Sequence, residues 1–215
     1  RTTMDLDTTV TGFTLTHESA EKVFREVAAV SIDDDWTFEF DRTEDIREAD
    51  DYPGICVLLK AMYPPMAVPL KIDVTTGDSI TPGPIVYDYP LLFDGGSVSL
   101  MSYPLETVLA EKLETAVSRG VANTRPRDFY DIHLLWRTRG GSCDIPTLRE
   151  ALKRTCAKRG STEMMTQWQE ILDEVATDKT MLALWSKYAK KNPYAAGIEL
   201  VQCCQTAGKI LGAAI

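Results

Sequence analysis

The sequence lacks any long hydrophobic segment, and this absence narrows the class of protein. No apolar run approaches the roughly 18–20 residues of a membrane-spanning helix, and the first residues show no signal-peptide pattern. We therefore expect no membrane span and no membrane partner. The 215 residues are 44% hydrophobic and 26% charged, which is ordinary for a globular protein of one or two domains.

Histidine is scarce, and the cysteines lack the spacing of metal ligands. The two histidines, His17 and His133, are far apart in the chain. The five cysteines are an odd number, and Cys203 and Cys204 are adjacent in an apolar segment. These features argue against a His/Cys zinc site and against a disulfide framework. We therefore expect reduced thiols in a cytoplasmic protein.

Positive charge is scarce in the first half of the chain. Residues 1–100 contain 7 Lys and Arg against 19 Asp and Glu, residues 101–215 contain 16 against 13, and the net charge is −9. This balance argues against non-specific binding to nucleic acid, although the second half could provide a local basic footprint. Its most basic stretches are more typical of solvated helix faces than of a phosphate-binding track: 125–127, 153–159 and 187–191.

Hydrophobic periodicity divides the chain into an α/β part and a helical part, so the expected fold class is α+β. Residues 1–103 predict a mixed sheet with a helix over 16–30, strands over 1–7, 36–40, 55–62, 70–74, 85–89 and 98–101, and an acidic connection over 44–51. Residues 104–215 predict helices over 105–119, 127–138, 146–158, 162–176, 179–190 and 194–211. We place the domain boundary between residues 103 and 104.

The first strand carries an acidic motif. In Arg1-Thr-Thr-Met-Asp-Leu-Asp7, side chains alternate between the two faces of the strand, so Thr3, Asp5 and Asp7 point to the same side. Two carboxylates in this arrangement form a clamp for a divalent cation. The alternative is a surface strand or turn in which Asp-x-Asp is incidental.

A second strand repeats the pattern. In Leu70-Lys-Ile-Asp-Val74, Lys71 and Asp73 share one face while the apolar residues share the other. If the two strands are neighbours, Asp5, Asp7 and Asp73 converge on an all-oxygen site of the kind that holds Mg²⁺ against phosphates. The second acidic strand favours a metal site over an incidental motif.

The helix expected over 105–119 carries a lysine on its apolar face. On a helical wheel, Lys112 falls in the middle of the face formed by Leu105, Val108, Leu109, Leu113 and Ala116. An inward lysine is costly unless its charge meets a partner, so this position implies an anion close to Lys112. The alternative is a side chain that reaches the rim of the face.

The helix that begins at Arg127 is apolar nearly all round, yet it carries three charged residues near its start. Arg127 and Asp131 are four residues apart, and Asp128 and Asp131 three apart. One interpretation is a structural Arg–Asp pair. In the other, Arg127 binds a phosphate while the carboxylates orient either it or Lys112. His133 lies on another face and is expected to be a packed residue.

These motifs resemble those of the AbiEii/AbiGii-type nucleotidyltransferase toxins, the toxic halves of abortive-infection toxin–antitoxin pairs in bacteria and archaea. The resemblance covers most of residues 1–136. It is carried by Arg1-x-Thr-x-Asp-Leu-Asp7, Lys-Ile-Asp-Val74, Gly77-Asp78-x-Ile-Thr-Pro82, Ser102-Tyr-Pro-Leu-Glu-Thr-Val-Leu-Ala-Glu-Lys112 and Asn123-Thr-Arg-x-Arg-Asp-Phe-Tyr-Asp131.

The resemblance implies a polymerase-β-like nucleotidyltransferase core followed by a helical C-terminal domain. It implies that Asp5 and Asp7 are the metal-binding pair and Asp73 the third catalytic carboxylate, with two Mg²⁺ ions as cofactors. The remaining positions that match the family's polar residues are nucleotide-binding candidates: Arg1, Thr3, Lys71, Lys112, Arg127, Asp128 and Asp131.

One family feature is not found in the sequence. In the superfamily, a Gly-Ser or Gly-Gly turn lies about ten residues before the acidic pair and grips the triphosphate, but Asp5 here has only four residues before it. Gly95-Gly96 is in the wrong place to substitute for that turn. We therefore expect the natural protein to begin before Arg1.

The expected function is transfer of a nucleotide from an NTP to an acceptor hydroxyl. The resemblance implies a tRNA 3′ end as one possible acceptor, a protein side chain as another, and a cognate antitoxin as partner. The same carboxylates would also serve a toxin that binds GTP or another nucleotide, or its antitoxin, without turnover. A third hypothesis is a structural domain whose acidic motif has no chemical role.

Overall fold

A computed structural model describes residues 6–32, 34–46, 54–91 and 95–215. The chain divides into two compact units, Arg1–Asp78 and Ser79–Ile215. The first contains a mixed sheet and a helix, and the second is mainly helical, so the expected α+β fold class is confirmed. The division lies before the hairpin of residues 85–102, whereas the sequence places the domain boundary after it.

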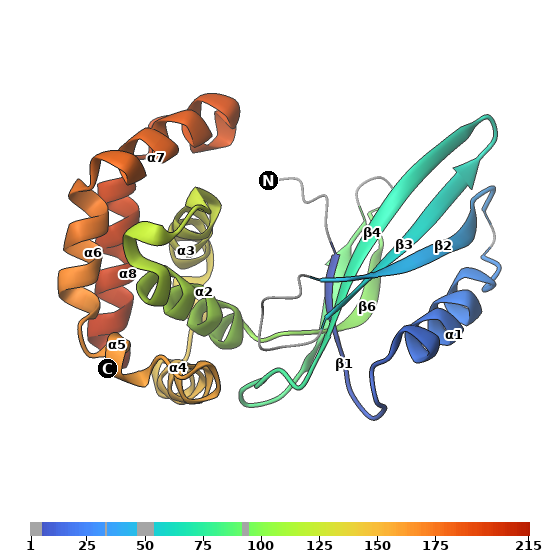
Figure 1. Cartoon of the computed structure of the whole chain (residues 1–215), viewed down its shortest axis with the longest axis horizontal. Coiled ribbons are helices and arrows are strands. Elements are labelled where there is room, and N and C mark those ends of the chain that lie inside the picture. Colours follow the sequence, from blue (N-terminus) through green and yellow to red (C-terminus); the bar gives the residue numbers. More distant parts are fainter. Residues whose placement is uncertain (1–5, 33, 47–53, 92–94) are drawn as a thin grey trace. The chain divides into compact units, whose positions relative to one another are not determined.

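The sheet of the first unit has the strand order β1-β4-β3-β2 (Figure 1). The strands are β1 (Leu6–Val10), β2 (Thr37–Asp45), β3 (Ile55–Tyr63) and β4 (Met66–Thr76). β1 pairs in parallel with β4, whereas β2, β3 and β4 pair in antiparallel order. The apolar run after residue 54 thus forms a central strand, as its composition predicts.

One helix covers one face of this sheet. The helix α1 (His17–Ala28) begins after Thr16, whose hydroxyl oxygen accepts a hydrogen bond from the Ser19 N–H. Ala20 of α1 packs with Ile55, Val57, Leu59 and Val74 in the core of the unit. Because side chains alternate along a strand, the even-numbered residues of β4 face α1 and the odd-numbered residues, Lys71 and Asp73 among them, face the other way.

The second unit begins with a two-stranded hairpin, β5 (Ile85–Pro90) and β6 (Ser97–Ser102). Its helices are α2 (Leu105–Arg119), α3 (Pro126–Arg139), α4 (Ile145–Arg159), α5 (Thr162–Met165), α6 (Trp168–Thr177), α7 (Lys179–Lys191) and α8 (Leu200–Ala214). The helix α8 packs against α3, α4 and α6, and α2 packs against α3 and α4 (Figure 1). No helix in the described part of the chain combines the length and apolar character needed to cross a membrane.

The structure corrects several of the sequence-based boundaries; for example, the strand expected over 70–74 runs from Met66 to Thr76. β2 runs on through residues 41–45, because residues 42–45 continue its antiparallel pairing with β3. The helix expected over 162–176 is two helices, α5 and α6. The helix expected over 194–211 begins at Leu200, because Gly197 has a positive φ of 79° that ends the preceding turn.

Candidate active site

Asp7 and Asp73 lie side by side on adjacent parallel strands. They are register partners in the pairing of β1 with β4. Register partners on neighbouring strands are separated by about 4.8 Å between strands and project from the same face. Both carboxylates therefore emerge from the face opposite α1. The structure brings these two predicted residues together, whereas Arg1, Thr3 and Asp5 lie outside the described residues.

The carboxylate of Asp73 lies in a partly buried position beside a lysine. Its side chain is 20% exposed, and Lys71 Nζ lies 3.3 Å from Asp73 Oδ1. That oxygen is buried and accepts no hydrogen bond from the described residues. A buried carboxylate oxygen is costly unless a donor or a cation satisfies it. The Lys71 ammonium is the cation beside Oδ1, and the 20% exposure of the Asp73 side chain leaves the carboxylate partly open to a further ligand.

Cys56 of β3 lies on the other side of Asp73. The two are register partners, and Cys56 is buried. Burial, followed by the neighbouring Asp73 carboxylate, raises the pKa of the Cys56 thiol to about 11. The thiol is therefore neutral near pH 7. Because metal binding and nucleophilic attack by cysteine both require the thiolate, we assign Cys56 a packing role beside the carboxylates.

The oxygen donors on this face fit a hard divalent cation. Mg²⁺ is bound in proteins by one or two carboxylates together with substrate phosphates and water, and Asp7 and Asp73 supply such a pair. Among the described residues, no group of three His, Cys, Asp or Glu side chains could hold a metal ion. The third carboxylate expected from the sequence, Asp5, lies outside them. The donor set of Asp7 and Asp73 thus fits Mg²⁺ held jointly with phosphate oxygens.

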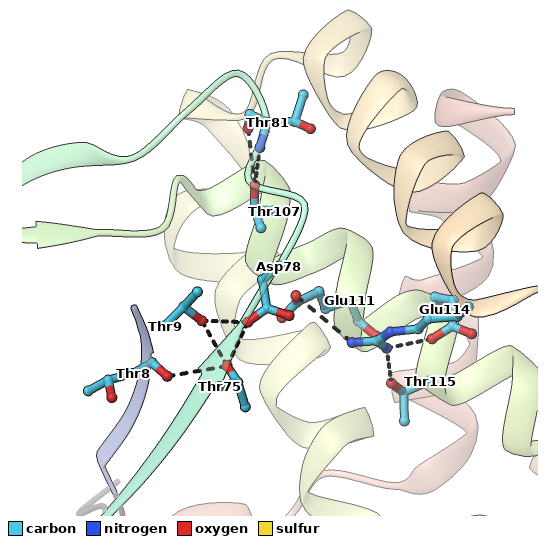
Figure 2. Close-up of polar contacts among 10 residues, drawn as sticks. Thr8, Thr9, Thr75, Asp78, Thr81, Thr107, Glu111, Glu114 and Thr115 are labelled. Carbon is cyan, nitrogen blue, oxygen red and sulfur yellow. Dashed lines mark hydrogen bonds and ion pairs between the residues drawn. The ribbon is translucent and has the colours of Figure 1, made fainter. Parts of the chain in front are cut away.

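Figure 2 shows a cluster of Thr9, Thr75 and Asp78. Thr9 and Thr75 lie two residues after Asp7 and Asp73 on the same strands. The Thr9 and Thr75 hydroxyls both donate hydrogen bonds to Asp78 Oδ2, the Thr75 bond measuring 2.7 Å. The two hydroxyl oxygens lie 2.9 Å apart. Sequence reasoning did not identify this cluster as part of the site. The available signal was the repeat of Asp-x-Thr at Asp7 and Asp73, which places both threonines on the carboxylate face.

The second unit contains a buried ion cluster between α2 and α3. Lys112 Nζ lies 3.3 Å from Asp128 Oδ1 and 3.0 Å from Asp131 Oδ2. The side chains of these aspartates are 11% and 8% exposed, and that of Lys112 is 24% exposed. The anion that the sequence implied near Lys112 is therefore this pair of carboxylates. Asp128 and Asp131 thus contact Lys112, while the phosphate-binding role of Arg127 stays a prediction.

Arg127 and His133 differ in their surroundings. Arg127 is exposed at the start of α3, and Asp131 bonds Lys112, so the alternative of a structural Arg127–Asp131 pair does not describe this helix. His133 is half-buried, and its Nδ1 lies 2.8 Å from Thr206 Oγ1 on α8. Burial and the nearby Arg137 lower the pKa of His133. His133 is thus a neutral packing residue near pH 7.

An ion pair with a buried carboxylate links α2 to the end of α4 (Figure 2). Arg159 Nη1 lies 2.6 Å from Glu114 Oε2 and donates a hydrogen bond of 3.0 Å to the Thr115 hydroxyl. Glu114 is 3% exposed. Buried carboxylates are tolerated when they are paired and hydrogen-bonded in this way. We assign this pair to the packing of the helical unit.

Comparison with known proteins identifies the family to which the chain belongs. The model of the nucleotidyl transferase AbiEii toxin of type IV toxin–antitoxin systems matches residues 1–200. No curated protein matches the chain.

Two crystal structures of Helicobacter pylori proteins resemble the chain. One is JHP933, with 14% sequence identity, a TM-score of 0.45, and coverage of 99% of this chain and 75% of that protein. The other is described as a putative nucleotidyltransferase, with 14% identity, a TM-score of 0.43, and coverage of 99% and 77%.

The family model spans the sheet that carries Asp7 and Asp73 as well as the helices that hold Lys112, Asp128 and Asp131. It therefore includes both groups of polar residues described above. The chain belongs to the AbiEii family of nucleotidyltransferase toxins of type IV toxin–antitoxin systems.

Proposed function

We propose that this protein is an Mg²⁺-dependent enzyme that transfers a nucleotide from an NTP to an acceptor hydroxyl. The observation that supports this most strongly is the register of β1 and β4, which sets Asp7 beside Asp73 on one face of the sheet. The exposed side chain of Asp7 and the partly exposed side chain of Asp73 leave this pair open to a cation. Bound Mg²⁺ would neutralise phosphate charge and lower the pKa of the attacking hydroxyl.

The protein's own residues have separate roles in this proposal. Asp7, with Asp5 before it, would hold the cation and through it the triphosphate. Asp73 would share the cation with Asp7 and help to lower the pKa of the acceptor hydroxyl. The acceptor oxygen forms a bond to the α-phosphorus, the bond between the α-phosphorus and the bridging oxygen breaks, pyrophosphate leaves, and the hydroxyl proton passes to solvent. The Lys71 ammonium, which lies beside Asp73, would reduce the repulsion between the Asp73 carboxylate and the negatively charged phosphates.

The helical unit carries the second set of candidate residues. We assign Lys112 and Arg127 to the charge of the phosphates and of the pyrophosphate leaving group, with Asp128 and Asp131 holding Lys112 in position. The proposed acceptor is the 3′ end of a tRNA, since its ribose offers a hydroxyl and the helical unit carries most of the chain's basic residues. The cognate antitoxin is the proposed protein partner.

A labelling assay tests this function. The full-length protein is incubated with total tRNA, Mg²⁺ and each α-³²P NTP in turn, beside the Asp7→Asn and Asp73→Asn variants. Glu26→Gln is the matched control, because Glu26 is an exposed carboxylate on α1, which covers the other face of the sheet. We expect label on RNA with wild type and Glu26→Gln, and a loss of at least about 100-fold in both aspartate variants.

Two other results would change the conclusion. Label on protein instead of RNA would replace tRNA by a side-chain acceptor. Nucleotide binding without label on any acceptor would contradict the transferase and favour a toxin that acts by sequestering nucleotide.

A further inference from the structure

The cluster of Thr9, Thr75 and Asp78 joins the two strands that carry the site carboxylates (Figure 2). Thr9 is on β1 and Thr75 on β4, and the two are register partners. Each lies two residues after a site carboxylate, Thr9 after Asp7 and Thr75 after Asp73. Side chains two residues apart on a strand point to the same face. The threonines and the carboxylates therefore form two adjacent rows on one side of the sheet.

The hydrogen bonds of the cluster converge on one acceptor oxygen of Asp78. Each threonine hydroxyl has a single proton to donate. Thr9 and Thr75 both direct that proton to Asp78 Oδ2, which can accept two hydrogen bonds as an ionised carboxylate. Thr75 Oγ1 also lies 3.2 Å from the Thr8 carbonyl oxygen of β1. Asp78 thus acts as a common acceptor that holds a side chain from each strand.

The cluster links β1 to β4, and this pairing is expected to be less stable than the antiparallel pairings of the sheet. β1 is an edge strand of five residues, and among the described strands it pairs with β4 alone. Parallel pairing is slightly less stable per residue than antiparallel pairing. A slip of one residue would turn Asp7 to the opposite face, toward the apolar core under α1. The position of Asp7 relative to Asp73 therefore depends on a contact that fixes this register.

The turn that precedes Asp78 allows it to reach both strands. β4 ends at Thr76, and Gly77 has a φ of 76°, in the region that glycine adopts at little cost. The chain changes direction there, and Asp78 returns to the carboxylate face beside Thr9 and Thr75. A residue with a β-carbon at Gly77 would be strained in this conformation even though no atom lies within 4 Å of an added Cβ.

We propose that Asp78 is a positioning residue for the metal site. It acts through Thr9 and Thr75 to hold Asp7 and Asp73 at the separation that a shared cation requires, and it does not contact the cation itself. The proposal rests on the proposed function, because it assumes that Asp7 and Asp73 bind a divalent cation. Residues that orient metal ligands typically change metal affinity about 10- to 100-fold when they are removed.

Metal binding without catalysis tests the proposal. Mn²⁺ serves as the probe, and the free ion is counted by electron paramagnetic resonance in titrations of the full-length protein with a non-hydrolysable NTP. We expect Asp78→Ala to weaken Mn²⁺ binding about 10-fold or more. Asp78→Asn should stay close to wild type, since its amide oxygen can still accept from the threonines. Glu26→Gln on α1 is the control for loss of one carboxylate.

A pair of threonine variants separates positioning from folding. Thr75→Val removes the hydroxyl but keeps the shape, whereas Thr75→Ser keeps the hydroxyl. We expect Thr75→Val to weaken Mn²⁺ binding and Thr75→Ser to retain it, with thermal unfolding measured for each. This pair decides the question if Asp78→Ala does not fold.

The outcomes distinguish this proposal from the proposed function. Wild-type protein that binds no Mn²⁺ would refute the metal site and the positioning role with it. Wild-type binding with unchanged affinity in folded Asp78→Ala, or in Thr75→Val, would refute the positioning role alone. Equal weakening in Thr75→Val and Thr75→Ser would also refute it, because the hydroxyl would then have no part.

Discussion

Lys112 on α2 places its Nζ 3.0 Å from Asp131 on α3, and the same nitrogen lies 3.3 Å from Asp128. One cation thus offsets two carboxylates that are almost fully buried. A buried carboxylate left without its partner is strongly destabilising, whereas an intact pair contributes little on balance. Removal of Lys112 should therefore lower the free energy of unfolding by more than removal of an exposed surface lysine does.

Lys112→Met should destabilise the protein by about 3 kcal/mol, because the buried carboxylates of Asp128 and Asp131 would each lose the Lys112 ammonium. Lys153→Met on α4 is the control, and this exposed residue should change the free energy of unfolding by less than about 0.5 kcal/mol. Urea denaturation of the three proteins measures both values. Equal stability of Lys112→Met and Lys153→Met would show that the cluster is not a buried ion group.

Arg127→Ala should leave stability nearly unchanged and weaken nucleotide binding. Arg127 is exposed, so its loss removes little packing, whereas a hydrogen bond to a charged phosphate contributes about 1.5–3 kcal/mol. We therefore expect an increase of about tenfold or more in the Kd for the Mg²⁺–NTP complex, measured by calorimetry. Arg139→Ala, an exposed arginine on the same helix, should bind as wild type does. The phosphate role of Arg127 is wrong if both variants bind alike.

Leu113→Ala should destabilise the helical unit by about 3 kcal/mol, because Leu113 is fully buried and its truncation leaves a cavity. Leu182 on α7 is 42% exposed, so Leu182→Ala should cost well under half of that. Thermal unfolding followed by circular dichroism compares the two. A similar loss in both variants would contradict the packing described for α2.

The Cys143 thiol should make stability depend on pH in the alkaline range. Burial and the Glu106 and Asp144 carboxylates raise its pKa from the ordinary value of 9.0 to about 11. Between these values the unfolded chain releases a proton that the folded chain retains, so this stabilisation is complete below pH 9 and falls as the pH rises toward 11.

Cys143→Ala should therefore show a smaller loss of stability between pH 8 and about pH 10 than wild type does. Urea denaturation at both pH values measures the difference, and comparison with wild type cancels the contributions of the other four cysteines. Identical losses in the two proteins would mean that Cys143 titrates as an exposed thiol does.

Part of the site follows from local sequence patterns. The alternation in Lys-Ile-Asp-Val74 predicts the face that Asp73 shares with Lys71, and the wheel position of Lys112 predicts an anion near it. Both predictions depend on residues within a few positions of each other, where strand and helix periods fix the geometry. The side-by-side position of Asp7 and Asp73 was conditional on strand order, which sequence periodicity does not determine.

Other parts of the site depend on pairings between distant residues. Gly77-Asp78 opens one of the motifs that carry the family resemblance, but only the β1–β4 register shows that Asp78 meets Thr9 and Thr75, the former nearly seventy residues away. The partners of Lys112 likewise come from another helix. In each case the deciding contact is set by tertiary packing, which overrides what a local pattern can specify.

The central claim is that Asp7 and Asp73 hold a cation together with the triphosphate. Its most direct test is anomalous diffraction at the manganese edge from crystals of the full-length protein grown with Mn²⁺ and a non-hydrolysable NTP. We predict an anomalous peak within about 2.0–2.3 Å of a carboxylate oxygen of Asp7 or Asp73 and of a phosphate oxygen. Ordered nucleotide with no peak at these carboxylates would contradict the claim.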